Sequence, residues 1–151
     1  MAEERGEQLT RAQREQLETE LAELEGPRRT EVVAAIKKAR EFGDLSENFE
    51  YHAAKNEQGL LEARIRTLRS RLDSAEIVAV ASGEEVGIGS VVEVADESGE
   101  AMTVEVSAVG GSGTVSPTSP LGSALLGHKP GDTVDVPAPR GSWRATIVAI
   151  R

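Results

Sequence analysis

Leucine and other apolar residues recur at alternating spacings of four and three through the first half of the chain. This repeat places a narrow apolar stripe along one face of a helix, as in a coiled coil. A weaker seam lies in residues 8–25, and a stricter one lies in residues 61–75. The first consists of Leu17, Leu21 and Leu24, and the second of Leu61, Ile65, Leu68, Leu72 and Ala75. The pattern therefore predicts two helical arms.

The predicted arms have distinct end signals. Pro27 lacks a backbone N–H, so we expect the first arm to break or kink there. Thr30 then resembles the N-cap of a further helical stretch, and Gly43 should end that stretch because glycine adopts positive φ readily. The second arm should run from Asn48 to Ala75. Two seamed arms joined by a short turn fold back on each other as an antiparallel pair.

Beyond residue 76 the periodicity changes to an alternation of apolar and polar residues, which is typical of strands. One short strand is expected within residues 77–89, where the chain crosses between its halves. The later strand positions are Val91 to Val94, Met102 to Val106, Val134 to Val136 and Trp143 to Ala149. Ser119 and Pro120 resemble the N-cap and first position of a helix that ends at Gly127.

These patterns together predict an α+β chain. A long antiparallel coiled-coil hairpin should occupy residues 1–76, with its tip at residues 43–48, and a small antiparallel sheet packed on one helix should occupy residues 90–151. Composition supports this division, because 11 of the 15 glycines and five of the six prolines lie in residues 77–151. The first half is instead rich in Glu, Arg, Ala and Leu, which favour helices.

The net charge of -9 narrows the possible partners. An acidic surplus in both halves does not favour binding of nucleic acid by counterion release alone, so any such contact should be local or supplied by a partner. The absence of cysteine excludes disulfides, thiolate metal sites and cysteine nucleophiles. No apolar run reaches the roughly 18 residues of a membrane span. We therefore expect a cytoplasmic protein without a membrane partner.

The segment between the arms, residues 43–55 (GDLSENFEYHAAK), combines a turn signal with chemically capable side chains. Asp44 and Glu47 are its centre. Asp-x-x-Glu at a helix start is a capping-box pattern, and this alternative stays open, although Ser46 and Asn48 would also serve as caps. Two carboxylates could instead form part of a divalent-cation site, completed by a phosphate or by another protein's carboxylates. Such a site suits two-metal hydrolysis of a phosphodiester.

Cationic and aromatic side chains flank these acids. Arg40 and Lys55 each lie on their own arm within two helical turns of the acids, where they could hold phosphates of a nucleic-acid end. Lys37 and Lys38 are more typical of a solvated helix face. Tyr51 has two equal interpretations, namely stacking on a base or packing against the other arm.

The chain resembles the bacterial Gre family of transcription elongation factors. The resemblance is carried by RRTEVVAAIKKAREFGDLSENFEYHAAKNEQGLLEARIRTL and by the later SPTSPLGSALLGHKPGDTVDVPAPRG. The run AREFGDLSENFEYHAAK is closer to GreA than to GreB. The resemblance covers nearly the whole chain, and it implies an N-terminal antiparallel coiled coil and a C-terminal domain of FKBP-like topology.

The resemblance also implies a mechanism. Such factors dock at the mouth of the secondary channel of RNA polymerase and push the coiled-coil tip to the active centre. Two tip acids, here Asp44 and Glu47 by motif match, help to hold a second Mg²⁺ and orient water, so that the polymerase cuts its own backtracked RNA. Arg40 and Lys55 fall at positions where the family carries basic residues near the RNA. Tyr51, from its own chemistry, is a further candidate for contact with the RNA end. The chain would then be an accessory factor rather than an enzyme, monomeric and without a cofactor of its own.

The second half favours an interaction surface over a catalytic pocket. It shows no paired acid–base set and no phosphate-binding loop. We therefore expect an interaction surface here, and the resemblance implies that this surface docks on the polymerase. The expected docking residues are Ser119, Pro120, Leu121 and Gly122.

Departures from the family pattern keep other functions open. The family often carries proline where this chain has Thr30, and alanine where it has Phe49. Residues 109–116 (VGGSGTVS) are short and glycine-rich where relatives carry an acidic stretch. Our leading hypothesis is stimulation of transcript cleavage. The alternatives are a channel-binding regulator that does not stimulate cleavage, and a coiled-coil adaptor unrelated to polymerase.

Overall fold

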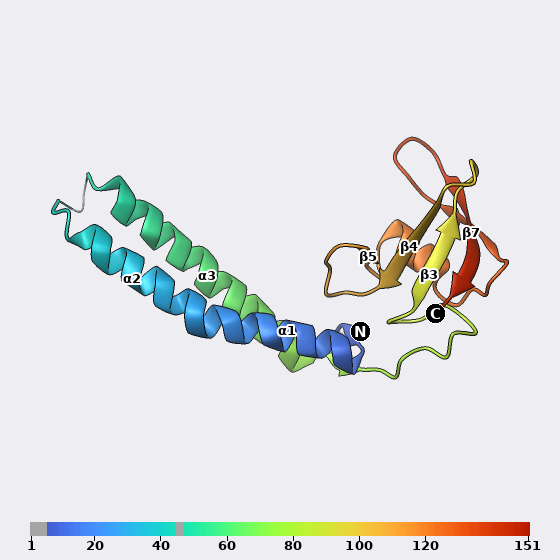
Figure 1. Cartoon of the computed structure of the whole chain (residues 1–151), viewed down its shortest axis with the longest axis horizontal. Coiled ribbons are helices and arrows are strands. Elements are labelled where there is room, and N and C mark those ends of the chain that lie inside the picture. The colour runs from blue at the N-terminus through green and yellow to red at the C-terminus, as the bar shows by residue number, and fades with distance from the viewer. Residues whose placement is uncertain (1–5, 45–46) are drawn as a thin grey trace, which may run out of the picture. The chain divides into compact units, whose positions relative to one another are not determined.

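The computed structural model describes residues 6–44 and 47–151, which form two compact units (Figure 1). One unit is residues 15–74, and the other combines residues 6–14 with 75–151. The helices and strands, in chain order, are β1 (Gln8–Leu9), α1 (Arg11–Glu23), the π-turn η1 (Leu24–Arg28), α2 (Arg29–Arg40), α3 (Phe49–Ser74), β2 (Glu76–Ile77), β3 (Val91–Ala95), β4 (Ala101–Val106), β5 (Thr114–Val115), α4 (Pro120–Leu125), β6 (Thr133–Val136) and β7 (Trp143–Ile150).

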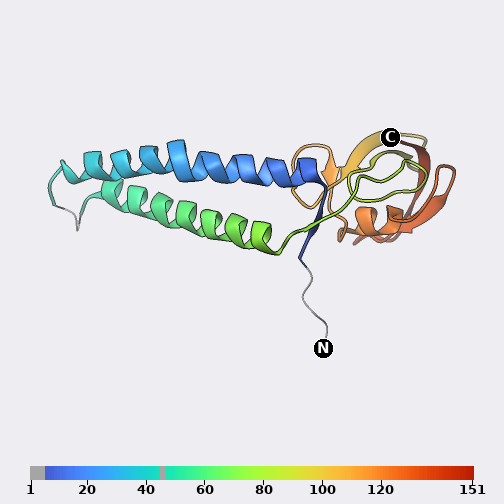
Figure 2. The ribbon, with the colours of Figure 1, turned by 90° about the horizontal axis from the view of Figure 1, so that it is seen from below.

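The first unit is an antiparallel helical hairpin. α1, η1 and α2 form one arm and α3 forms the other (Figure 2). The two predicted seams are confirmed, with Leu17 and Leu68 fully buried and Leu21 half-buried. The core nearest the tip consists of Val32, Ile36, Ala54, Leu61 and Ile65. A two-helix hairpin buries only one stripe per helix, which explains how the arms fold with so few aromatic residues.

Ion pairs between the arms accompany this narrow core. They are Arg28–Glu57 at 3.3 Å and Arg29–Glu62, Arg64–Glu20 and Arg69–Glu25, each at 2.9 Å. The hydrogen bond from Arg69 lowers the pKa of the Glu25 carboxyl. Exposed pairs of this kind each contribute little stability, about 0–1 kcal/mol. Their common effect is on register, because sliding one arm past the other would break all of them.

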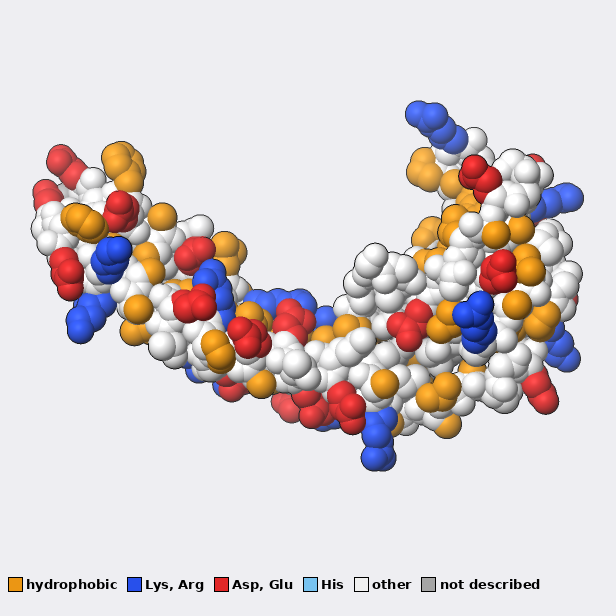
Figure 3. Space-filling model, viewed as in Figure 1, with side chains coloured by type: hydrophobic (Ala, Val, Ile, Leu, Met, Phe, Trp, Pro, Cys, Tyr) orange, Lys and Arg blue, Asp and Glu red, His pale blue; other side chains and the backbone are white. Residues whose placement is uncertain are grey.

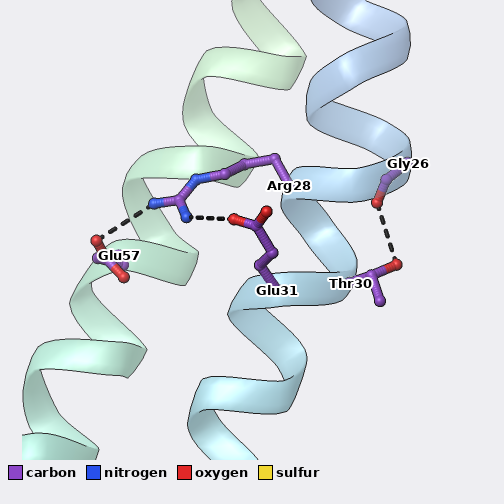
Figure 4. Close-up of polar contacts among 5 residues, drawn as sticks. All are labelled: Gly26, Arg28, Thr30, Glu31 and Glu57. Carbon is purple, nitrogen blue, oxygen red and sulfur yellow. Dashed lines mark hydrogen bonds and ion pairs between the residues drawn. The ribbon is translucent and has the colours of Figure 1, made fainter.

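The first arm passes Pro27 without a break. Residues 24–28 wind as a π-turn, in which the Arg29 N–H donates to the Leu24 carbonyl five residues earlier. This wider winding accommodates a proline that an α-helix would reject. The prediction of Thr30 as an N-cap is wrong, because Thr30 lies inside α2 and its hydroxyl donates to the Gly26 carbonyl at 3.1 Å (Figure 4).

The second unit is built on a five-stranded sheet in the order β5-β4-β3-β7-β6. The antiparallel prediction is confirmed for β3 with β4, β3 with β7 and β6 with β7. It is wrong for β5, which runs parallel to β4. The core of the unit is Val86, Val92, Val94, Val104, Val106, Leu125, Val134, Val136, Ala145 and Ile147. Leu125 comes from α4, so the helix packs on the sheet as expected.

The first described residues belong with this sheet unit rather than with the hairpin, whereas composition predicted a single boundary near residue 76. β1 pairs in parallel with β2. Thr10 and Gln13 then form a reciprocal capping box at the start of α1, with bonds of 3.1 and 3.2 Å. The buried amide of Gln13 also donates to the Val106 carbonyl at 3.0 Å. The Thr-x-x-Gln spacing was a signal that could have located this helix start.

Candidate functional site

The tip of the hairpin forms between the last turn of α2 and the first turn of α3. The Phe42 N–H donates to the Ala39 carbonyl and the Gly43 N–H to the Arg40 carbonyl, which tightens the end of the helix. Gly43 has φ of +99°, a conformation that favours glycine, so its prediction as the helix stop is confirmed. Asp44 follows directly. Residues 45 and 46, which include the alternative cap Ser46, lie outside the described residues.

Asn48 fixes the start of α3. Its side-chain oxygen accepts the Tyr51 N–H at 3.1 Å, which makes Asn48 the N-cap. Its side-chain amide donates to the Ala39 carbonyl at 2.7 Å, in the last turn of α2. One side chain therefore caps one helix and ties it to the other. This arrangement does not favour the capping-box interpretation of Asp44 and Glu47, because the helix they would cap already has its cap.

Asp44 and Glu47 line one open hollow at the tip. Both residues are exposed, and Figure 3 shows acidic and hydrophobic side chains side by side at this end of the hairpin. Phe42, Asn48, Phe49 and Glu50 complete the lining. The structure thus brings together the two acids that the sequence singled out, on a surface that another molecule can reach.

The two acids are too few to make a metal site by themselves. Among residues 6–44 and 47–151, no group of three or more His, Cys, Asp or Glu side chains is arranged to hold a metal ion. Mg²⁺ prefers six oxygen ligands and commonly binds proteins through one or two carboxylates together with phosphates and water. Asp44 and Glu47 could supply the two carboxylates of such a shared site.

A second hollow beside the tip gathers positive charge. It is lined by Arg40 and Lys37 from α2, by Lys55 from α3, and by Val33, Ile36 and Gln58. The structure therefore brings Arg40 and Lys55 together across the arms, as a nucleic-acid contact would require. It adds Lys37, which sequence reasoning assigned to a solvated face. The Lys55 ammonium is held by Gln58 at 3.1 Å.

Tyr51 packs into the hairpin. Its ring is half-buried against the core cluster of the two arms. The Arg40 guanidinium lies over the ring, 5.8 Å from its centroid, in a cation–π contact. This geometry favours the packing interpretation of Tyr51, and it lets the ring hold Arg40 in place. Contact of Tyr51 with RNA stays a prediction.

The predicted docking residues lie at the start of α4. Ser119 is the N-cap, as predicted: its oxygen accepts the Gly122 N–H at 3.1 Å, and its hydroxyl donates to the Ser116 carbonyl at 2.6 Å. Gly122 is buried, and a Cβ there would lie 1.9 Å from the Ser116 oxygen. Leu121 packs against the sheet core, and Pro120 is exposed. Ser119 and Gly122 thus have structural roles that suffice to explain them.

Comparison with known families assigns both halves of the chain. Residues 7–77 match the family described as "Transcription elongation factor, N-terminal", and residues 81–151 match "Transcription elongation factor, GreA/GreB, C-term". None of the helices formed by the described residues is long and apolar enough to cross a membrane.

Individual relatives agree with this assignment. The chain is 45% identical over 150 residues to transcription elongation factor GreA of Streptococcus sanguinis, covering 94% of this chain and 93% of that protein. It is 42% identical over 142 residues to GreA of Acidiphilium cryptum, covering 89% and 90%. A solved structure of the transcription factor Gfh1 is 35% identical, with a TM-score of 0.50 and 99% of both chains covered. The chain therefore belongs to the GreA/GreB family of transcription elongation factors.

Proposed function

We propose that this chain enters the secondary channel of bacterial RNA polymerase and stimulates the polymerase's own Mg²⁺-dependent cleavage of backtracked RNA, which rescues arrested complexes. The observation that carries the proposal is the placement of Asp44 and Glu47. Both acids are exposed and line one hollow at the hairpin tip, while Asn48 caps the following helix. Both acids therefore face solvent, where another molecule can reach them. The chain would act in the cytoplasm as an accessory factor, not as a free nuclease.

The two carboxylates suit a Mg²⁺ ion that is shared with the polymerase. Asp44 and Glu47 would supply two oxygen ligands, and the polymerase and the RNA phosphate would supply the others. When bound, the ion would orient water for attack on the phosphodiester and stabilise the charge that develops on it. Without the ion, the same acids would repel the phosphates of the RNA end. Both the binding of the RNA end at the tip and its cleavage would therefore require Mg²⁺.

The positive hollow complements the acids. Arg40 and Lys55 lie in it from opposite arms, and Lys37 lies beside them. We propose that these cations hold phosphates of the RNA near its 3′ end, with the planar guanidinium of Arg40 positioned by the Tyr51 ring. Their role is positional, because phosphate contacts fix register without reading base identity.

The hairpin supplies reach. α3 has 26 residues, which corresponds to about 39 Å at 1.5 Å per residue. The buried seam and the ion pairs between the arms keep the two helices in one register, so the tip can be presented as a defined unit. We propose that the sheet unit docks on the polymerase at the start of α4, where Pro120 is exposed.

The proposal is tested by cleavage in stalled, backtracked elongation complexes. Addition of the wild-type chain with Mg²⁺ should release short 3′ RNA fragments, and Asp44→Asn or Glu47→Gln should abolish release without loss of polymerase binding. Glu41→Gln is the matched control, because it removes one exposed negative charge close to the tip from a residue that does not line the hollow. If wild type slows nucleotide addition but releases no fragments, the chain is instead a channel-binding regulator without cleavage activity.

A further inference from the structure

Two phenylalanines at the hairpin tip, Phe42 and Phe49, are exposed to solvent. Phe42 is 65% exposed and Phe49 is 87% exposed. Phenylalanine gains stability by burial, so two largely exposed rings at one place contribute little to this fold. Tyr51, two residues after Phe49, shows the contrasting arrangement of an aromatic ring packed against the arms. The exposed pair therefore suggests contact with another molecule.

The surroundings of the pair indicate the chemistry of that molecule. Phe42 and Phe49 line the same hollow as Asp44, Glu47 and Glu50. An apolar pocket of a protein that covered the rings would also have to strip water from these carboxylates, which is costly. A nucleotide offers a flat base for the rings and a phosphate that the acids can share through a cation. The positive hollow next along the hairpin suits the following phosphates.

We propose that Phe42 and Phe49 form a stacking platform for the base of the nucleotide at the 3′ end of the RNA. This inference rests on the proposed function and adds a positioning element to it. The acids and cations act on the sugar–phosphate backbone, and the rings hold the base, so that the terminal nucleotide is fixed at two points. Because every base has a π-face, the platform accepts any 3′ nucleotide and favours purines, which stack more strongly than pyrimidines.

The test compares two RNA ends and six proteins in the single-turnover cleavage assay. The RNA carries either an ordinary purine or an abasic nucleotide at its 3′ end. The proteins are wild type, Phe49→Ala, Phe49→Leu, Phe49→Trp, Phe42→Ala and a control variant. Leucine keeps an apolar side chain but has no ring to stack, whereas tryptophan keeps the ring. Leu60→Ala is the matched control, because Leu60 is 64% exposed on the same helix away from the tip.

Phe49→Ala should slow cleavage of the purine end roughly tenfold, because it removes one base–aromatic stack, and a factor of ten corresponds to about 1.4 kcal/mol. It should leave the already slow abasic end unchanged. Phe49→Trp should restore the rate, Phe49→Leu should not, and Leu60→Ala should match wild type. Phe42→Ala should behave as Phe49→Ala does.

Three results would overturn the platform alone. An equal loss on both RNA ends would mean that the ring does not act on the base. Full activity of Phe49→Leu would assign the ring to an apolar contact with the polymerase. A wild-type rate for Phe49→Ala on the purine end would show that the ring has no role in cleavage. The proposed function would not be affected by that result. Absence of cleavage by wild type would overturn both proposals, and the two failures are therefore distinguishable.

Discussion

Replacement of Asn48 by alanine should loosen the tip of the hairpin, because the Asn48 side chain joins the end of α2 to the start of α3. Asn48 makes two hydrogen bonds, accepting the Tyr51 N–H at 3.1 Å and donating to the Ala39 carbonyl at 2.7 Å. Loss of an N-cap costs about 1 kcal/mol. Loss of the hydrogen bond to the carbonyl of buried Ala39 costs about another 1 kcal/mol. We therefore expect Asn48→Ala to lower the free energy of unfolding of the hairpin by about 2 kcal/mol.

The two bonds can be separated by a second variant. Asn48→Asp keeps an oxygen that caps α3, and its charge suits a helix N-terminus, but it cannot donate to the Ala39 carbonyl. Asn48→Asp should therefore be less destabilised than Asn48→Ala. Its transcript cleavage should still be slower than wild type, because the start of α3 is no longer tied to α2 and the acids lose their common support.

Helical circular dichroism in a denaturant titration measures the first effect, and the cleavage assay measures the second. Amide exchange at Tyr51 locates the change at the cap. The reasoning is refuted if Asn48→Ala unfolds like wild type and keeps full Tyr51 protection. An equal loss of stability in Asn48→Asp and Asn48→Ala would show that repulsion between the new carboxylate and the Ala39 carbonyl offsets the cap.

Two further changes probe the sheet unit. Gly122→Ala places a Cβ 1.9 Å from the Ser116 backbone oxygen, so α4 must shift. We expect the free energy of unfolding to fall by about 1–3 kcal/mol, as measured by thermal denaturation. An unchanged midpoint would contradict the packing at α4. The Asp96 carboxyl accepts hydrogen bonds from the Ser98 hydroxyl at 2.6 Å and the Ser98 N–H at 2.9 Å, and these bonds lower its pKa. Asp96 therefore contributes stability that is complete above its ordinary pKa of about 4 and is lost as the pH falls through the lower pKa of the folded state. Asp96→Asn should flatten the acid side of a plot of melting temperature against pH.

The regular parts of the fold were predictable because their signals are local. The four–three spacing of Leu61, Ile65 and Leu68 gives a helix with one buried face, and the structure buries all three. Ser119 followed by Pro120 likewise specified the start of α4 from two adjacent residues. In both cases the residues that carry the pattern are also the residues that make the contacts.

What could not be predicted depends on contacts between distant segments or on alternative winding. The parallel pairing of β5 with β4 involves two residues, too few for any periodicity. At Pro27 the sequence shows a missing N–H but not that a π-turn will absorb it. The positive hollow could not be predicted without knowing the register of the two arms, because Lys37 and Lys55 come together only when the helices are paired. The two acids could be recognised from the sequence, but only the hydrogen bond from the Tyr51 N–H identifies Asn48 as the N-cap of α3.

The central claim is that the tip acids act inside the active centre of RNA polymerase. It is tested most directly by the rate of 3′ fragment release from a backtracked complex, measured with wild type and with Asp44→Asn at equal occupancy of the polymerase. We predict that wild type accelerates release in the presence of Mg²⁺ and that Asp44→Asn returns the rate to that of polymerase alone. Equal rates for the two proteins would contradict the claim.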